Sequence, residues 1–264
     1  MYLVLDKSFL QGASKKFIEK LCSHHQVIMP EVLLMEILTT DEKDMHSCIA
    51  KFPNTVNPVN LIPNVGTLIR YEVINKKPCT PIESQFINET FILNKNFVLS
   101  QEQLSILSNW EDEVSTDSFR FIQKAVITQG WFPELQEYKP GISISKIEEA
   151  MGKVANNSNF VKEIYAQIHN EIRKMDDQPW PNESTINQDW AIYRYHQVHL
   201  LYALEYIRRY GFSVPNEIKK KLENFRIDID YCVIGALSDG LLTNDNLLVQ
   251  LYTIICPKKR VIKL

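Results

Sequence analysis

Two short apolar segments, one near each end of the chain, lead directly into aspartates. Residues 2–5 are followed by Asp6, and residues 241–243 are followed by Asn244 and Asp245. Short, almost wholly apolar segments are typical of strands that are buried on both faces, as in a parallel sheet covered by helices. If both strands belong to one sheet, the two ends of the chain must fold together. The sequence therefore predicts a domain built from both ends.

The pattern between these ends changes twice. The first part alternates strand and helix, with helices expected at residues 9–22 and 30–40, a strand at 26–29, and an irregular strand-turn-helix at 57–71. Apolar residues at helical spacing dominate the middle of the chain, and they predict helices at 101–110, 117–128, 144–154, 160–175 and 188–210. We expect an α/β domain from residues 1–80 and 212–264, interrupted by a largely helical insertion at 81–211.

The last fifty residues return to the α/β pattern. They predict helices at 215–224 and 228–237, a strand at 241–243, a helix at 247–251, and a final strand at either 252–256 or 260–264. Only 8 glycines occur among the 264 residues, which favours helix over a turn-rich all-β fold. The fold class predicted from these patterns is α/β.

Charge and cysteine content restrict the possible partners and compartment. The net charge of −3 excludes a bulk polycation, so any contact with a phosphate backbone must come from local basic patches. The 5 cysteines contain no C-x-x-C pair and are interpreted as reduced thiols. No long apolar run follows a basic leader, so we expect a cytoplasmic protein without a membrane segment.

Four acidic residues are candidates for one site. Asp6 and Asp245 follow strands, at the edge where open α/β sheets place their active sites. Glu36 lies beside the apolar stripe of its helix, where it can either lean toward Asp6 or remain a surface glutamate. Asp230 shares the buried face of residues 233, 234 and 237, in what we expect to be the first turn of a helix.

Each of these positions has an alternative interpretation. Asp228 suits an N-cap and competes with Asp230 for the third position, while the sequence around Asp245 is also typical of a simple turn. Thr243 can bond a carboxylate or the backbone that follows it. No lysine or arginine partner is expected for the acids in these motifs. A cluster of unpartnered carboxylates is costly without a cation, and its hard oxygen ligands suit Mg²⁺ or Mn²⁺. The acids together therefore indicate a metal-dependent nuclease.

The motifs around these acids resemble the PIN-domain nuclease family. The matching segments are Leu5-Asp6-Lys7-Ser8, residues 27–36 ending in Glu36, residues 230–237 opening with Asp230, and Leu241-Leu242-Thr243-Asn244-Asp245. The resemblance covers about a third of the chain. It implies a Rossmann-like parallel sheet, a Mg²⁺ or Mn²⁺ site and phosphodiester hydrolysis, usually of RNA, with Ser8 orienting Asp6. PIN domains are commonly about half this length, so the helical insertion departs from the family pattern.

The resemblance and the acids lead to a specific mechanism. Asp6, Asp230 and Asp245 are expected to bind the ion, while Glu36 binds a second ion or orients the attacking water. Lys219, Lys220 and Arg226 are candidates for binding the phosphate backbone, although solvated helix faces are the more common explanation of such residues. A toxin or defence role follows from the resemblance alone.

Other interpretations of the chain remain open. It could be an inactive PIN-like module that binds or assembles partners through its helical insertion. A haloacid-dehalogenase-type phosphatase also places an aspartate after the first strand, but that chemistry needs a second aspartate where this chain has Ser8. His196, His199 and the tryptophans of the insertion are interpreted as packing residues. The sequence does not indicate an oligomeric state.

Overall fold

The computed structural model describes residues 1–93, 101, 105, 107, 109–110, 130–132, 135, 144–172, 180–211 and 219–264, and the side chains of 144, 170–172 and 219–223 are excluded from that description. The helix expected at 117–128 lies outside the described residues, and so does most of the one expected at 101–110.

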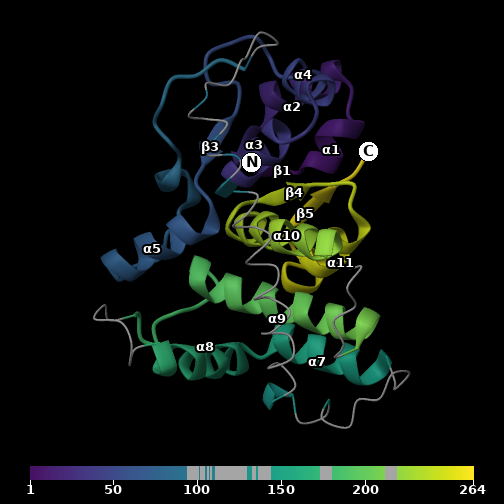
Figure 1. The fold of residues 1–264 in the computed structure, drawn as a ribbon. Helices are drawn as coiled ribbons and strands as arrows, with labels where there is room; N and C mark the ends of the chain where they lie inside the picture. Colours follow the sequence, from purple (N-terminus) through teal and green to yellow (C-terminus); the bar gives the residue numbers. More distant parts are fainter. Residues whose placement is uncertain are drawn as a thin grey trace. The chain divides into compact units, whose positions relative to one another are not determined.

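A parallel sheet is the centre of the fold. Within the described residues, five strands follow the order β3-β2-β1-β4-β5, with every neighbouring pair parallel. The strands are β1 (Tyr2–Leu5), β2 (Gln26–Pro30), β3 (Asn60–Ile62), β4 (Gly240–Leu242) and β5 (Arg260–Ile262). β1 pairs with β2 on one side and with β4 on the other, so strands from both ends of the chain lie side by side (Figure 1). The predicted α/β class and parallel sheet are confirmed.

Side-chain caps start two of the helices around the sheet, α2 (Lys15–His24) and α4 (Glu42–Ile49). The other helices around the sheet are α1 (Lys7–Gly12), α3 (Glu31–Leu38), the 3-10 helix η1 (Ile82–Gln85), α10 (Lys219–Leu237) and α11 (Asn246–Ile255). The single helix expected at 9–22 is divided, because the Ser14 side chain accepts the N–H of Phe17 at 3.2 Å and starts α2 as an N-cap. The Asp41 carboxylate caps α4 in the same way, through the N–H of Asp44.

The expected break between the last long helices is wrong, whereas one of the two alternatives for the final strand is correct. The helices expected at 215–224 and 228–237 form one continuous helix over the described part, α10, so Asp228 is an interior helical residue and not an N-cap. No proline or glycine between Lys219 and Ile234 interrupts the helix. Of the two final strands considered, 260–264 contains β5, whereas residues 252–256 overlap α11.

The chain divides into two compact units. The sheet unit comprises Met1–Leu68, Thr80–Asp112 and Asp230–Leu264, and the helical unit comprises Ile69–Cys79 and Glu113–Ile229. These boundaries differ from the expected division into 1–80 with 212–264 and 81–211. Part of α5 (Val65–Asn75) and the first part of α10 belong to the helical unit, while residues 80–112 belong to the sheet unit.

The helical unit is organised around a single buried helix. α9 (Ala191–Tyr210) packs against α7 (Ile144–Asn156) and α8 (Ser158–Ile172), and most of its side chains are buried. Its N-cap residue, Trp190, has no side-chain acceptor, and the buried carboxylate of Glu72 takes that role. Glu72 accepts the N–H groups of Ala191 at 2.7 Å and Ile192 at 2.9 Å. Across the described ranges, no helix is both long and apolar enough to cross a lipid bilayer.

Candidate functional site

The topology of the sheet creates a switch point between β1 and β4. From β1 the chain passes to β2 on one side of the sheet, and from β4 it passes to β5 on the opposite side. The segments that follow these two neighbouring strands therefore diverge, which leaves the place where open parallel sheets bind their ligands. Asp6 directly follows β1, and Thr243, Asn244 and Asp245 follow β4.

Asp6 is buried and firmly held at this point. Its side chain Oδ2 accepts the hydroxyl of Thr243 at 2.6 Å and also the hydroxyl of Ser8. The Asp6 residue is only 5% exposed, and Thr243 is fully buried. Both hydroxyl contacts anticipated for Ser8 and Thr243 are thus present. They fix the orientation of a carboxylate that would otherwise rotate about two side-chain bonds.

The two segments that follow β1 and β4 are also bonded to each other. The N–H of Asn244 donates to Ser8 Oγ at 3.0 Å, and its side-chain amide donates to the Ser8 carbonyl at 3.2 Å. The N–H of Asp245 donates to Thr243 Oγ1 at 3.0 Å. Ser8 bonds both Asp6 and Asn244, and Thr243 bonds both Asp6 and the main chain of Asp245. One continuous network therefore joins the Asp6 carboxylate to the main chain that follows β4.

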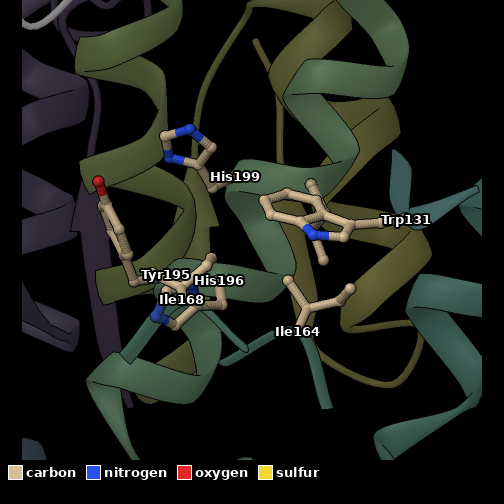
Figure 2. A pocket seen from close by; sticks show the side chains of 7 residues that line it. Trp131, Ile164, Ile168, Tyr195, His196 and His199 are labelled. Carbon is tan, nitrogen blue, oxygen red and sulfur yellow. The ribbon is translucent and has the colours of Figure 1, made fainter. Parts of the chain in front are cut away.

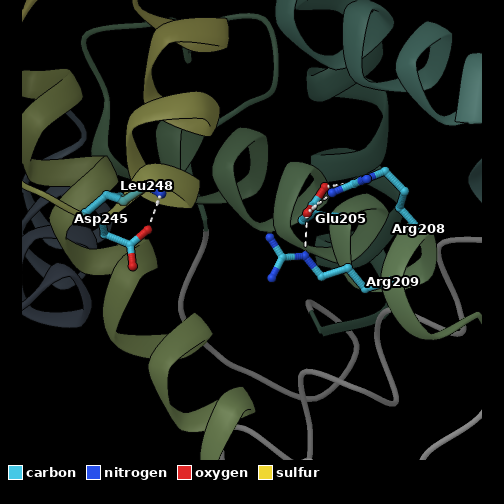
Figure 3. A network of polar contacts seen from close by, with 5 residues as sticks. All are labelled: Glu205, Arg208, Arg209, Asp245 and Leu248. Carbon is cyan, nitrogen blue, oxygen red and sulfur yellow. Dashed lines mark hydrogen bonds and ion pairs between the residues drawn. The ribbon is translucent and has the colours of Figure 1, made fainter.

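Asp245 has a structural role in addition to its place near Asp6. Its Oδ1 accepts the N–H of Leu248 at 2.9 Å, which makes it the N-cap of α11 (Figure 3). The alternative of a simple turn at this position is therefore replaced by a helix cap. An N-cap aspartate uses one of its two oxygens for the helix, and the other can bind a ligand.

Three of the four predicted acids affect one another electrostatically. Burial raises the pKa of Asp6, the bonds from Ser8 and Thr243 oppose that rise, and the charge of Asp245 adds to it. Burial also raises the pKa of Glu36, to about 7, and the charge of Asp6 contributes to that rise. The charge of Asp245 therefore acts on Asp6 and the charge of Asp6 acts on Glu36, as expected for carboxylates that lie near one another.

Glu36 has two partners that sequence reasoning missed. The hydroxyl of Tyr231 donates to Glu36 Oε2 at 2.5 Å, and Lys7 Nζ donates to the main-chain oxygen of Glu36 at 3.0 Å. Both lower the pKa of the Glu36 carboxyl against the larger effect of burial. The expectation that the acidic motifs contain no basic partner is therefore wrong for Glu36. Lys7 follows Asp6 directly, but its reach across to α3 depends on the packing of α1.

Asp230 is placed differently from the other three acids. It is 2% exposed, so its expected position on the buried face is correct, but it lies inside α10 and not in a first turn. Asp228, the alternative third ligand, is half-buried in the helical unit. The structure thus links Asp6 electrostatically with Glu36 and with Asp245, and the place of Asp230 in the site stays a prediction.

Asp6 and Asp245 are the carboxylates of this site that could bind a divalent cation. Among the residues that the structure describes, no three histidine, cysteine, aspartate or glutamate side chains are arranged to hold a metal ion. Mg²⁺, however, is usually bound through only one or two carboxylates, with water and substrate phosphate as the other ligands. Asp6 and Asp245 are hard oxygen donors whose charges oppose each other, so their chemistry fits Mg²⁺ or Mn²⁺.

The basic residues near the last acidic motif differ in how far the structure describes them. The side chains of Lys219 and Lys220 lie outside that part, and Arg226 is half-buried on α10. Lys259 Nζ donates to the carbonyls of Ala236 and Ser238, both at 2.6 Å, at the end of α10. Lysines at such positions satisfy helix-terminal carbonyls, so Lys259 is a helix-capping residue.

An arginine pair in the helical unit is similarly occupied. Arg208 and Arg209 both bond the carboxylate of Glu205, whose side chain is fully buried, at distances of 2.6 to 2.7 Å (Figure 3). Burial raises the pKa of Glu205, but these two arginines outweigh it and the net pKa is lowered. Arg208 and Arg209 therefore compensate a buried charge.

A small pocket lies within the helical unit, between α8 and α9. It is lined by Trp131, Ile164, Ile168, Tyr195, His196, His199 and Leu200 (Figure 2). Its volume of about 30 Å³ accommodates about two water molecules and is too small for a nucleobase. His196 is 8% exposed, and its Nε2 lies 3.2 Å from that of His169. These observations agree with the interpretation of His196 as a packing residue.

Comparisons with known proteins do not assign a family. No family model matches the chain, and searches of the curated proteins and of the solved structures found no significant match.

Proposed function

We propose that this protein is a metal-dependent nuclease with a PIN-like sheet unit, and that it hydrolyses phosphodiester bonds, with RNA favoured over DNA. One observation carries the proposal: Asp6 raises the pKa of Glu36, and Asp245 raises the pKa of Asp6, at the switch point of a parallel sheet. Carboxyl groups whose pKa is raised by burial and by a neighbouring carboxylate, as at Asp6 and Glu36, are a common sign of function. The strand order and the places of Asp6, Glu36 and Asp245 support the resemblance to PIN domains.

The residues present suggest how the site would work. Asp6 and Asp245 would hold Mg²⁺ or Mn²⁺, and Asp230 remains a proposed additional ligand. When bound, such an ion lowers the pKa of a water molecule and neutralises the leaving oxygen. Ser8 and Thr243 orient Asp6, and the N–H of Leu248 orients Asp245. Glu36 has a pKa of about 7, which suits a group that accepts a proton from the attacking water near neutral pH.

Residues outside the acidic site are proposed to bind the substrate or a partner. Lys219, Lys220 and Arg226 are proposed to contact the phosphate backbone of RNA, and the helical unit is proposed to select the substrate or a protein partner. A cytoplasmic location and a toxin or defence role also remain proposals. The second candidate function is a PIN-like binding module without activity. It is favoured by the two hydroxyls that already bond Oδ2 of Asp6.

Cleavage of a labelled single-stranded RNA, with Mg²⁺ or Mn²⁺ added, separates these functions. We expect the wild-type protein to cut, and Asp6→Asn and Asp245→Asn to lower the rate by about 100-fold or more, because each removes a charge that the ion needs. Asn at position 245 keeps an oxygen for the N–H of Leu248, so the cap of α11 is retained.

Asp41→Asn is the matched control for Asp245→Asn. Asp41 caps α4 through the N–H of Asp44 at 2.9 Å, the same distance that joins Asp245 to Leu248. It should cut RNA at the wild-type rate. Cleavage by Asp245→Asn at that same rate would remove Asp245 from the site. An inactive wild-type protein with both metals would favour the binding module.

A further inference from the structure

Tyr231 lies inside the sheet unit with its hydroxyl against the site. The residue is 1% exposed, and it belongs to the part of α10 that packs in this unit. Its hydroxyl donates to Glu36 Oε2 at 2.5 Å, within the range of hydrogen bonds between a hydroxyl and an ionised carboxylate. A buried tyrosine has only two rotatable side-chain bonds and is held by packing, so it is a rigid donor.

The main chain at Glu36 is held by side chains that bond the last turn of α3. Glu36 lies two residues before Leu38, the last residue of α3, in the turn where main-chain carbonyls lack partners within the helix. Lys7 Nζ donates to the Glu36 carbonyl at 3.0 Å, and Thr39 Oγ1 donates to the neighbouring Met35 carbonyl at 3.0 Å. Lys7 and Thr39 therefore fix the main chain at Glu36, while the side chain beyond it still has three rotatable bonds.

We infer that Tyr231 is a positioning residue, whose hydroxyl holds the Glu36 carboxylate beside Asp6 in the orientation that the hydrolysis needs. This inference rests on the proposed nuclease function. Because the bond uses Oε2, the other carboxylate oxygen, Oε1, is available for a water molecule or an ion.

The role of Tyr231 differs from that of a second buried tyrosine in the same unit. Tyr252 is fully buried on α11, and its hydroxyl donates to the Gly235 carbonyl at 3.0 Å. Replacement of either tyrosine by phenylalanine removes a buried hydroxyl and its bond to Glu36 or to Gly235, while the ring remains. The hydroxyl of Tyr231 bonds a proposed catalytic side chain, whereas that of Tyr252 bonds a helical carbonyl.

The test measures kcat and KM for RNA cleavage by Tyr231→Phe and Tyr252→Phe at saturating Mn²⁺. We expect Tyr231→Phe to lower kcat by about 10-fold to 100-fold, with KM nearly unchanged, because a displaced catalytic group slows the chemical step. Tyr252→Phe should keep both constants. In the double variant Tyr231→Phe with Glu36→Gln, kcat should fall no further than in Glu36→Gln alone, because the hydroxyl acts through Glu36.

Glu36→Asp provides a second route to the same answer if Tyr231→Phe does not fold. It keeps the charge but withdraws the carboxylate from the Tyr231 hydroxyl, so it should show a similar loss of kcat. An active wild-type protein whose kcat is unaffected by Tyr231→Phe, or by Glu36→Asp if that variant is needed, overturns the positioning role alone. Additive losses in the double variant do the same. A wild-type protein that cuts no RNA overturns the nuclease proposal and the positioning role together.

Discussion

At the scale of single residues, the surroundings of the Glu36 carboxyl group disfavour its ionised form. Burial and the neighbouring charge of Asp6 raise its pKa from 4.5 to about 7. Between pH 4.5 and about pH 7 the Glu36 carboxyl is protonated in the folded protein but ionised in the unfolded chain. The free energy of unfolding must therefore fall as the pH rises through this window, and the full penalty remains above about pH 7.

Glu36→Gln should therefore stabilise the metal-free protein at high pH relative to wild type. The gain should be absent below about pH 4.5 and should approach 3 kcal/mol as an upper limit at about pH 8. A glutamine oxygen can still accept the Tyr231 hydroxyl, so the variant loses the charge but not the bond. Urea unfolding at about pH 5 and about pH 8 measures the difference.

Glu19→Gln is the control for this comparison. Glu19 forms an exposed ion pair with Lys15 at 3.9 Å, and such pairs contribute about 0 to 1 kcal/mol. Its effect should be small and nearly independent of pH. An equal change in unfolding free energy for Glu36→Gln at both pH values would contradict the raised pKa.

At the scale of elements, apolar periodicity indicated α9 correctly, but not what begins it. The helix expected at 188–210 is observed as Ala191–Tyr210, because its apolar spacing is long and regular. Its cap comes from Glu72, which is 119 residues away from Ala191 and could not be found locally. The prediction of a break before Asp228 was wrong because a local signal was over-read. Aspartate is typical of an N-cap, but here it is tolerated inside the continuous helix α10.

Glu72→Gln tests the capping of α9. The carboxylate accepts the N–H groups of Cys79 at 3.0 Å, of Ala191 and of Ile192, and an amide group can present only one oxygen to these three donors. We expect the variant to lose about 1 to 3 kcal/mol of unfolding free energy. Thermal or urea unfolding of the purified variant measures this loss. Glu83→Gln, at an exposed position on η1, should stay within about 0.5 kcal/mol of wild type.

At the scale of the whole molecule, the fold depends on pairing the two ends of the chain. The short strands followed by acids were sufficient to predict this pairing and to place Asp6 and Asp245 near each other. Tyr231 and Lys7 were not predictable as partners of Glu36, because their contacts depend on how α10 and α1 pack and not on any local pattern.

Gly240 is a position where this pairing leaves little space. It lies in β4, between β1 and β5, opposite Leu3 and Arg260. A Cβ atom at this position would lie 2.5 Å from the main-chain oxygen of Arg260 and 3.1 Å from Leu3 Cδ2. A backbone atom cannot move aside as a flexible side chain can. Gly240→Ala must therefore push β5 away from β4 or shift β4 against β1.

We expect Gly240→Ala to lower the free energy of unfolding by about 1 to 3 kcal/mol, as overpacking in a buried core usually does. Gly152→Ala is the matched control, because a Cβ atom there meets nothing within 4 Å and the residue lies inside α7. That variant should be neutral or up to about 1 kcal/mol more stable, since alanine favours helix over glycine. Urea unfolding of both variants measures the two effects. If Gly240→Ala were as stable as Gly152→Ala, β4 could not be packed this closely between the first and last strands, and the carboxylates that depend on this pairing would lose their common support.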